Sequence, residues 1–334
     1  MTGLAALPKI ELHLHLDCSM SYRAVSQLVP GLTLDQYRSD YVAPARCTDL
    51  AHFLECSRNG VQLLQDESAL KLVVEDVFEQ LQADSVIYVE LRFAPLLHTQ
   101  RGLTPERVVA IVNEATDRMS LATGIEARLI LCTLRHFNEQ QSMATAQLVH
   151  AFRRTRVAAI DIAGNEAGFP LQPHISAFEY ALELNLFRTA HAGEAAGPSS
   201  VWETLRHLQP TRIGHGIRSI EDAQLVEHLG EHRIHLEVCP CSNVQIVPSV
   251  EDLRHHPIDR LYRAGVPLSI NTDTRMLTPT TLTHEYEEVH RVFNWTLDDF
   301  RRTNLMAVQA AFLDEEAKRR LGETINRAYA ARAV

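Results

Sequence analysis

Eight short apolar segments rich in β-branched residues alternate with stretches of helical period along the 334 residues. Strands that alternate with helices predict βαβ units and a parallel sheet. Eight such units at this length favour an α/β fold of the TIM-type (β/α)8 barrel class, with a doubly wound open sheet as the structural alternative. The predicted strands are 9–16, 85–94, 126–134, 157–163, 186–192, 212–217, 234–240 and 266–273.

Two segments depart from this alternation, and we expect a single domain over 1–334 that contains both. Residues 18–66 separate the first strand from the next predicted helix, Glu67–Ala83, and contain a further helix near 50–64. A helical insertion there would lie over the barrel mouth as a lid. Residues 298–329 are predicted to form two extra C-terminal helices joined near Asp314.

The sequence marks both ends of one predicted helix, between Thr104 and Gly124. Thr104 is a good N-cap, Pro105 suits the first helical position, and Gly124 is a typical stop.

Composition excludes several classes of partner. The formal net charge is -10 and no basic run is present, so nucleic acid is not an expected partner. The N-terminus lacks a basic n-region and a long apolar h-region, and no apolar stretch is long enough for a membrane span. The six cysteines are too sparse for a disulfide scaffold. We therefore expect a cytoplasmic protein with a small-molecule ligand.

The first strand carries His13 and His15, followed by Asp17. Side chains at i and i+2 share one face of a strand, so both imidazoles are expected to enter the barrel interior. Polar rings side by side in such an interior need partners, and a shared cation supplies one. The alternative is a chance pair among 17 histidines. The lone Cys239-x-Cys241 pair has no second half, so packing at a strand end is favoured over a zinc site.

Three further polar residues end predicted strands: His191 the fifth, His215 the sixth and Asp273 the eighth. The carboxyl ends of barrel strands meet at one face, where active sites form. Three histidines and one carboxylate suit Zn²⁺ with room for water. Each residue taken singly has a simpler interpretation as a hydrogen-bonded strand-end group, but their joint placement favours a metal site.

A zinc site that keeps a water makes hydroxide available near neutral pH. Glu194, three residues after His191, is placed to carry a proton between water and substrate. His215 has no adjacent acid, so we expect it to orient the water rather than bind the metal. The residues together predict metal-assisted hydrolysis.

Seven motifs in order along the chain resemble the adenosine deaminases of the amidohydrolase superfamily. They are PKIELHLHLD (8–17), YVELRFAP (88–95), AIDIAGNE (159–166), HAGE (191–194), RIGHGI (212–217), LEVCPCSN (236–243) and SINTD (269–273). The resemblance implies a zinc-dependent enzyme, with one Zn²⁺ per chain, that hydrolyses the C6 amino group of an adenine-type purine and releases ammonia.

The resemblance also implies roles for individual residues. Glu194 corresponds to the acid that protonates purine N1, and His215 to the histidine that positions the attacking water. Gly164 matches the backbone donor to purine N3, and Asp17 the carboxylate that binds the sugar hydroxyls. The implied zinc ligands are His13, His15, His191 and Asp273, of which His15 also borders the substrate.

The chain departs from the family pattern around the substrate. A second aspartate usually follows the metal-binding one and contacts purine N7, whereas this chain has Thr274 and then Arg275. The hydroxyl of Thr274 could donate there instead, or Arg275 could reach an acceptor on a different ring. Cys18 replaces a usual glycine, and Ser57 stands where an aromatic residue is expected beside the apolar gate of Phe53 and Leu54.

Several functions therefore compete at this stage. The first is deamination of adenosine, deoxyadenosine or a modified relative such as aminodeoxyfutalosine, or of free adenine. The second is hydrolysis of an amide or phosphoester, but Lys9, Lys71 and Lys318 are the only lysines and none suits a bridge between two metals. The third is a binding protein that has lost turnover, which a complete ligand set with Glu194 argues against.

Overall fold

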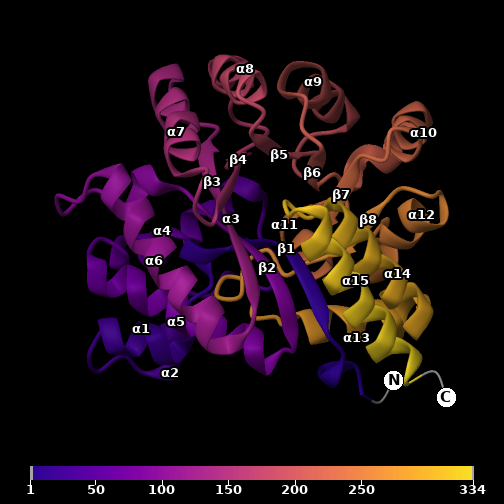
Figure 1. The fold of residues 1–334 in the computed structure, drawn as a ribbon, viewed down its shortest axis with the longest axis horizontal. Coiled ribbons are helices and arrows are strands. Elements are labelled where there is room, and N and C mark those ends of the chain that lie inside the picture. The colour runs from indigo at the N-terminus through magenta and orange to yellow at the C-terminus, as the bar shows by residue number, and fades with distance from the viewer. Residues whose placement is uncertain (1–2, 333–334) are drawn as a thin grey trace.

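The computed structural model describes residues 3–332, in which eight parallel strands form one sheet in the order β1 to β8 (Figure 1). Each strand pairs in parallel with the next. The barrel closes where the N–H of His15 donates to the carbonyl of Asp273 (2.7 Å) and the N–H of Asp273 to the carbonyl of His13 (3.0 Å). The predicted barrel is confirmed. The strands are β1 (Lys9–His15), β2 (Val86–Phe93), β3 (Glu126–Leu134), β4 (Val157–Ala163), β5 (Phe187–Ala192), β6 (Arg212–His215), β7 (His235–Val238) and β8 (Leu268–Ile270).

Helices surround this sheet, and the C-terminal pair packs outside it, with α14 against β1 and β8 (Figure 1). The helices are α1 (Tyr22–Leu28), α2 (Leu34–Asp40), α3 (Leu50–Cys56), α4 (Arg58–Leu63), α5 (Glu67–Ala83), α6 (Pro105–Thr123), α7 (Glu139–Phe152), α8 (Ile175–Glu183), α9 (Pro198–Leu208), α10 (Ala223–Glu231), α11 (Pro240–Ile246), α12 (Ile258–Arg263), α13 (Leu282–Phe293), α14 (Leu297–Ala310) and α15 (Glu315–Ala330).

Local sequence signals explain several of these boundaries. The side chain of Thr104 accepts the N–H of Arg107 at the start of α6, and Gly124 ends the helix with a φ of 76°. The two C-terminal helices meet at Asp314, whose side chain caps α15. The single helix predicted near 50–64 is instead two, α3 and α4, which are separated at Ser57; the hydroxyl of Ser57 donates to the carbonyl of Leu54 (2.7 Å) in the last turn of α3.

The later strands are shorter than predicted. Pro240 begins α11 directly after β7, and Gly216 turns the chain after β6 with a φ of 65°. Asp273 lies three residues beyond the end of β8 rather than at its end, and an isolated bridge to Leu14 holds it there. The expectation that Asp273 belongs to the strand was wrong. Its place at the carboxyl face of the barrel is as expected.

The barrel interior contains buried charges as well as apolar side chains. The guanidinium of Arg92 donates to Asp161 Oδ2 (2.9 Å) and to Glu237 Oε2 (2.6 Å). Arg212 pairs with Glu237 Oε1 (2.7 Å) and with Glu90. Because buried charges are costly unless paired, this network holds the strands of the interior in a fixed relative position.

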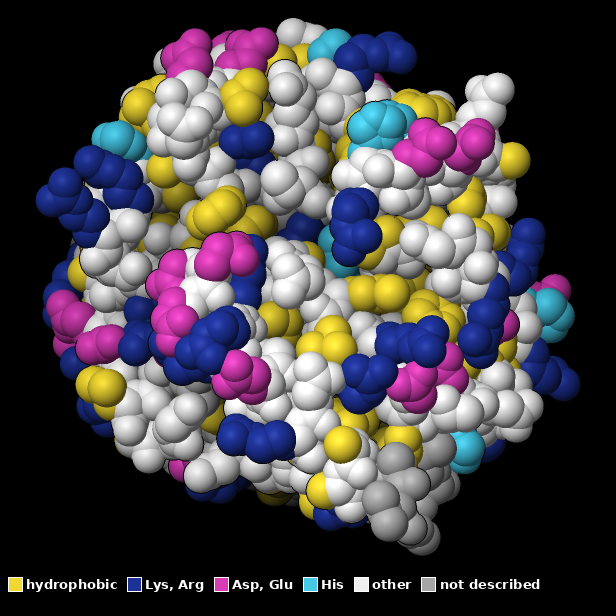
Figure 2. Space-filling model, turned by 45° about the vertical axis from the view of Figure 1, so that its right-hand side comes forward, with side chains coloured by type: hydrophobic (Ala, Val, Ile, Leu, Met, Phe, Trp, Pro, Cys, Tyr) yellow, Lys and Arg dark blue, Asp and Glu magenta, His cyan; other side chains and the backbone are white. Residues whose placement is uncertain are grey.

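The outer surface is mixed in charge. On the face drawn in Figure 2, basic and acidic side chains are interspersed and no continuous basic stripe is visible. Within residues 3–332, no helix combines the length and the apolar character needed to cross a bilayer.

Candidate active site

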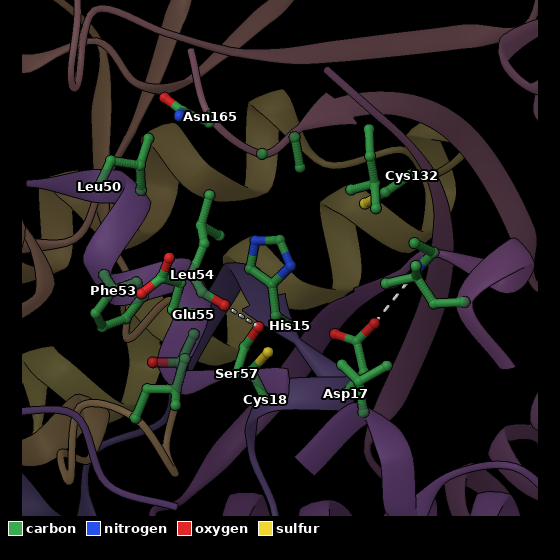
Figure 3. A pocket seen from close by; sticks show the side chains of 18 of the residues that line it. His15, Asp17, Cys18, Leu50, Phe53, Leu54, Glu55, Ser57, Cys132 and Asn165 are labelled. Carbon is green, nitrogen blue, oxygen red and sulfur yellow. Dashed lines mark hydrogen bonds between the residues drawn. The ribbon is translucent and has the colours of Figure 1, made fainter. Parts of the chain in front are cut away.

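A cavity of about 850 Å³ lies at the carboxyl ends of the strands. Its floor includes His15, His191, Glu194, His215 and Asp273. Its opposite wall comes from the 18–66 insertion, whose residues Leu50, Phe53, Leu54 and Ser57 face the cavity (Figure 3). The volume is in the range of pockets that enclose small organic ligands.

The predicted metal ligands converge on this floor. Ring nitrogens of His13, His15 and His191 all lie within 4.8 Å of one another. Asp273 Oδ1 lies 3.4 Å from His13 Nε2 and 3.5 Å from His15 Nε2. Residues from β1, β5 and the segment after β8 thus form one cluster.

Hydrogen bonds to the Nδ1 atoms of two histidines orient their rings so that Nε2 faces the cluster. His13 Nδ1 donates to Glu237 Oε2 (2.9 Å), and His191 Nδ1 donates to Asp161 Oδ1 (3.2 Å). With Nδ1 as the donor, the Nε2 of each ring is the nitrogen that faces the cluster and can offer a lone pair to a cation. Among the described residues, His13 Nε2 is buried with no hydrogen-bond partner. Unprotonated nitrogens that face each other and a carboxylate fit a bound cation.

Cys239 Sγ also lies within 4.8 Å of ring nitrogens of His13 and His215. Its thiol donates to the carbonyl of Glu237 (3.5 Å), and burial, with the charge of Asp273, raises its pKa well above the ordinary value. Because a protonated thiol is a poor metal ligand, Asp273 is the better fourth donor.

Two of the site residues have strained backbones. His215 has a φ of 61° and Asp273 a φ of 65°, in the left-handed region that non-glycine residues seldom occupy. Each such residue costs on the order of 1 kcal/mol or more, and such strain gathers at functional sites. Asp273 is held further by Ser242, whose hydroxyl donates to its Oδ2 (2.6 Å).

Glu194 is buried beside the cluster. Asn243 Nδ2 donates to its Oε1 (3.2 Å), and His215 Nδ1 lies 3.4 Å from the same oxygen. Burial, followed by the negative charges of Asp273 and Glu166, raises the pKa of Glu194 well above its ordinary value. A carboxyl group that keeps its proton near neutral pH is suited to act as a general acid.

The loop that carries Glu194 is held by hydrogen bonds to the side chain of Glu166. This carboxylate accepts the backbone N–H groups of four consecutive residues at 2.7–3.1 Å and the hydroxyl of Ser200 at 2.5 Å; the four are Gly193, Glu194, Ala195 and Ala196. Glu166 was not among the predicted site residues.

The surroundings of His215 also determine the protonation state of its ring. Burial, followed by the neighbouring His13, lowers the pKa of His215 well below its ordinary value. The ring is therefore neutral near neutral pH and carries one proton, which it can donate. This agrees with a positioning role rather than a permanent positive charge.

The predicted substrate residues line the same cavity: Asp17, Gly164 and Thr274. Asp17 Oδ2 accepts the N–H of Ala94 (3.4 Å) and lies 3.5 Å from His98 Nε2. Gly164 has a φ of 95°, which a residue with a Cβ atom would adopt only under strain.

Arg275 does not reach the cavity, contrary to the alternative that the sequence left open. Its guanidinium donates to Glu11 Oε2 (2.7 Å) and Asp84 Oδ2 (3.0 Å). These two buried carboxylates hold the side chain inside the protein. Thr274 does line the cavity, where its hydroxyl oxygen accepts the N–H of Thr278 (3.3 Å).

Comparisons with known proteins agree with this geometry. The family model for adenosine deaminase matches residues 8–328. An adenosine deaminase of Haemophilus ducreyi is 35% identical over 339 aligned positions, which cover 98% of each chain. The chain belongs to the adenosine deaminase family.

Solved structures of two relatives extend the comparison. The adenine deaminase of Arthrobacter aurescens has a TM-score of 0.88 and 26% identity, covering 96% of this chain and 98% of its own. The N6-methyl-AMP deaminase of Arabidopsis thaliana has a TM-score of 0.85 and 25% identity, covering 97% and 98%. As a member of this family, the chain is a hydrolase that acts on carbon–nitrogen bonds, and it deaminates adenine-type purines.

Proposed function

We propose that the chain removes the C6 amino group of adenosine or deoxyadenosine with one Zn²⁺ held by His13, His15, His191 and Asp273. The observation that carries the proposal is the position of Glu194, a buried carboxyl with a raised pKa, beside this ligand cluster at the cavity floor. Bound Zn²⁺ supplies the Lewis acidity that makes water nucleophilic near neutral pH.

The protein's own groups perform the remaining steps. Glu194 delivers a proton to purine N1, which makes C6 electrophilic as water adds. His215 donates a hydrogen bond that orients the attacking water. Gly164 offers its N–H to purine N3. The carboxylate left on Glu194 takes the proton that the water loses as it adds to C6. Ammonia leaves when the hydroxyl proton on the tetrahedral C6 passes to the amino nitrogen and C6 forms its double bond to oxygen, which gives the 6-oxo purine with its proton on N1.

A nucleoside suits the cavity better than a free base. At about 850 Å³ the cavity exceeds what a purine alone fills, and Asp17 lies in it as a carboxylate acceptor for sugar hydroxyls. Burial alone would raise the pKa of Asp17, but His98 outweighs it and lowers the pKa, so the acceptor stays charged. The similarity to curated adenosine deaminases supports the same substrate. Free adenine and modified nucleosides are the competing substrates, because Thr274 stands beside the last ligand.

We also assign the 18–66 insertion the role of a lid. Its helices α3 and α4 supply apolar side chains to the cavity wall opposite His15 (Figure 3). Covering the purine with Phe53 and Leu54 excludes bulk water, which strengthens the polar contacts of the site.

The cytoplasm is the compartment that we propose. The six cysteines all lie in the described part of the chain and none forms a disulfide there, which supports a reducing environment. A small-molecule substrate is the only partner that the proposal requires.

A screen of ammonia release tests the proposed function. The substrates are adenosine, deoxyadenosine, adenine and 5′-modified nucleosides, with cytosines and pterins as controls. We expect the highest kcat/KM with a nucleoside, and Asp17→Asn should reduce kcat/KM for adenosine more than for adenine. Equal losses for both would contradict the sugar contact, and preferred turnover of free adenine would contradict the nucleoside assignment.

A further inference from the structure

A series of buried hydrogen bonds leads from the segment between α11 and α12 to the catalytic groups. It begins at a donor whose identity is fixed, the backbone N–H of Ile258, which donates to His256 Nδ1 (3.1 Å). The neutral ring of His256 therefore carries its proton on Nε2. That nitrogen lies 3.3 Å from Asn243 Oδ1, so it donates to the amide oxygen. Burial lowers the pKa of His256 to about 3, which keeps the ring neutral.

The orientation of the Asn243 amide follows. With its oxygen occupied by His256, its two N–H groups point the other way. One donates to Glu194 Oε1 (3.2 Å) and the other to His215 Nδ1 (3.1 Å). All four residues are buried, so water does not compete for these bonds. In a buried network of this kind each bond directs the next.

We propose that Asn243 and His256 are positioning residues that set the protonation geometry of both catalytic groups. Because Nδ1 of His215 accepts from Asn243, the ring proton of His215 is placed on Nε2, the nitrogen free to donate to water. Because Oε1 of Glu194 accepts from the same amide, the acidic proton of Glu194 is placed on Oε2. One amide thus selects the donating atom of both groups. This effect on turnover rests on the proposed function.

Two substitutions at His256 separate this role from a purely structural one. In His256→Gln, the Nε2 of glutamine takes the place of the ring Nε2, so donation to Asn243 is kept and the bond from Ile258 N–H is lost. In His256→Asn, the side-chain oxygen can accept the N–H two residues on, as asparagine does in turns, but the side chain is too short to reach Asn243. Each variant therefore loses one of the two hydrogen bonds of His256: His256→Gln loses the bond from Ile258, and His256→Asn loses the bond to Asn243.

Steady-state kinetics on the zinc-loaded enzyme give the first readout. We expect His256→Gln to keep kcat within about threefold of the wild type, because its bond to Asn243 remains. His256→Asn should lower kcat about tenfold with little change in KM, since no substrate contact is removed. Asn243→Asp, which keeps the acceptor and loses both donors, should lower kcat about 100-fold. Equal losses of kcat in the two His256 variants, or none in His256→Asn, would overturn the proposal.

Nitrogen-15 NMR of labelled histidine gives a second readout that does not depend on turnover. Subtraction of the His215→Asn spectrum identifies the signals of His215. We expect an unprotonated Nδ1 and a protonated Nε2 in the wild type and in His256→Gln, and a mixture of the two tautomers in His256→Asn. A wild-type ring protonated on Nδ1 would overturn the proposal. If no purine were deaminated, the expected tautomers would still support this inference while the proposed function failed.

Discussion

The Nε2 atoms of His15 and His191 lie 3.2 Å apart, although one residue belongs to β1 and the other to β5. The proton of His191 is on Nδ1, where Asp161 accepts it, so its Nε2 offers a lone pair toward His15. Ring nitrogens of both residues lie within 4.8 Å of one of His13, and His15 Nε2 lies 3.5 Å from Asp273 Oδ1. A cation shared by the four side chains accounts for this convergence.

Removal of one ligand should therefore lower metal content. We predict that His13→Ala binds much less zinc than one ion per chain, because three donors remain and the Nδ1 partner of Glu237 is lost. Zinc per chain is measured by atomic absorption after dialysis. His207→Ala, at an exposed histidine of α9, is the matched control and should keep full zinc. Full occupancy in His13→Ala would argue against ligation.

Replacement of Glu194 should separate metal binding from proton transfer. Glu194→Gln keeps the shape of the side chain and loses its acidic proton. We predict that kcat falls about 10³-fold, within the range for removal of a general acid, while zinc content stays at the wild-type value. The control is Glu203→Gln on the exposed side of α9. Turnover near the wild-type rate in Glu194→Gln would remove the residue from the mechanism.

Thr274 is the position predicted to tune specificity. It lines the cavity beside Asp273, and Thr274→Asp would restore the acid that the family usually has there. We expect kcat/KM for adenosine relative to 5′-modified nucleosides to rise about tenfold, the effect of one good hydrogen bond to the purine. Thr274→Val, which has the same shape without the hydroxyl, should not produce this rise. An unchanged substrate profile in Thr274→Asp would mean that specificity is set elsewhere.

Glu285 should make stability depend on pH. Burial raises its pKa to about 8 although Cys241 N–H (3.1 Å) and Thr280 Oγ1 (3.2 Å) donate to it. A carboxyl group whose pKa is higher in the folded state than the unfolded value of about 4.3 stabilises the fold most at low pH. This contribution to the free energy of unfolding is lost as the pH rises to about 8. Each pKa unit corresponds to about 1.4 kcal/mol, so wild type should lose about 3 kcal/mol from this group between pH 6 and pH 9.

The neutral variant Glu285→Gln isolates this contribution. Its free energy of unfolding in urea should change less than that of the wild type over the same pH interval, so it gains relative stability at pH 9. Parallel pH dependence in the two proteins would show that Glu285 does not titrate in this range.

Much of the fold could be predicted because its signals are local. The apolar face and Asp66 cap of α5, and the Thr104, Pro105 and Gly124 signals of α6, depend on neighbouring residues only. Strand alternation likewise placed His13 and His15 on one face. The ends of β6 to β8 were overestimated, because pairing there depends on the neighbouring strand and not on the segment itself.

The supporting residues could not be found in the same way. Glu166, Glu237 and Asn243 lie inside the motifs that predicted the site, but their partners come from other strands and loops. A charged residue within an apolar strand, such as Glu237, was the available signal. The direction of Arg275 also depends on Glu11 and Asp84, which are distant in the sequence.

The most direct test of the central claim is deamination by the protein before and after removal of its metal. Ammonia and the 6-oxo purine are measured together with zinc per chain, with adenosine as substrate. We predict equal amounts of the two products, loss of activity in the metal-free protein, and recovery in proportion to added zinc up to one ion per chain. Full activity without metal, or no ammonia from any 6-aminopurine with one zinc bound, would contradict it.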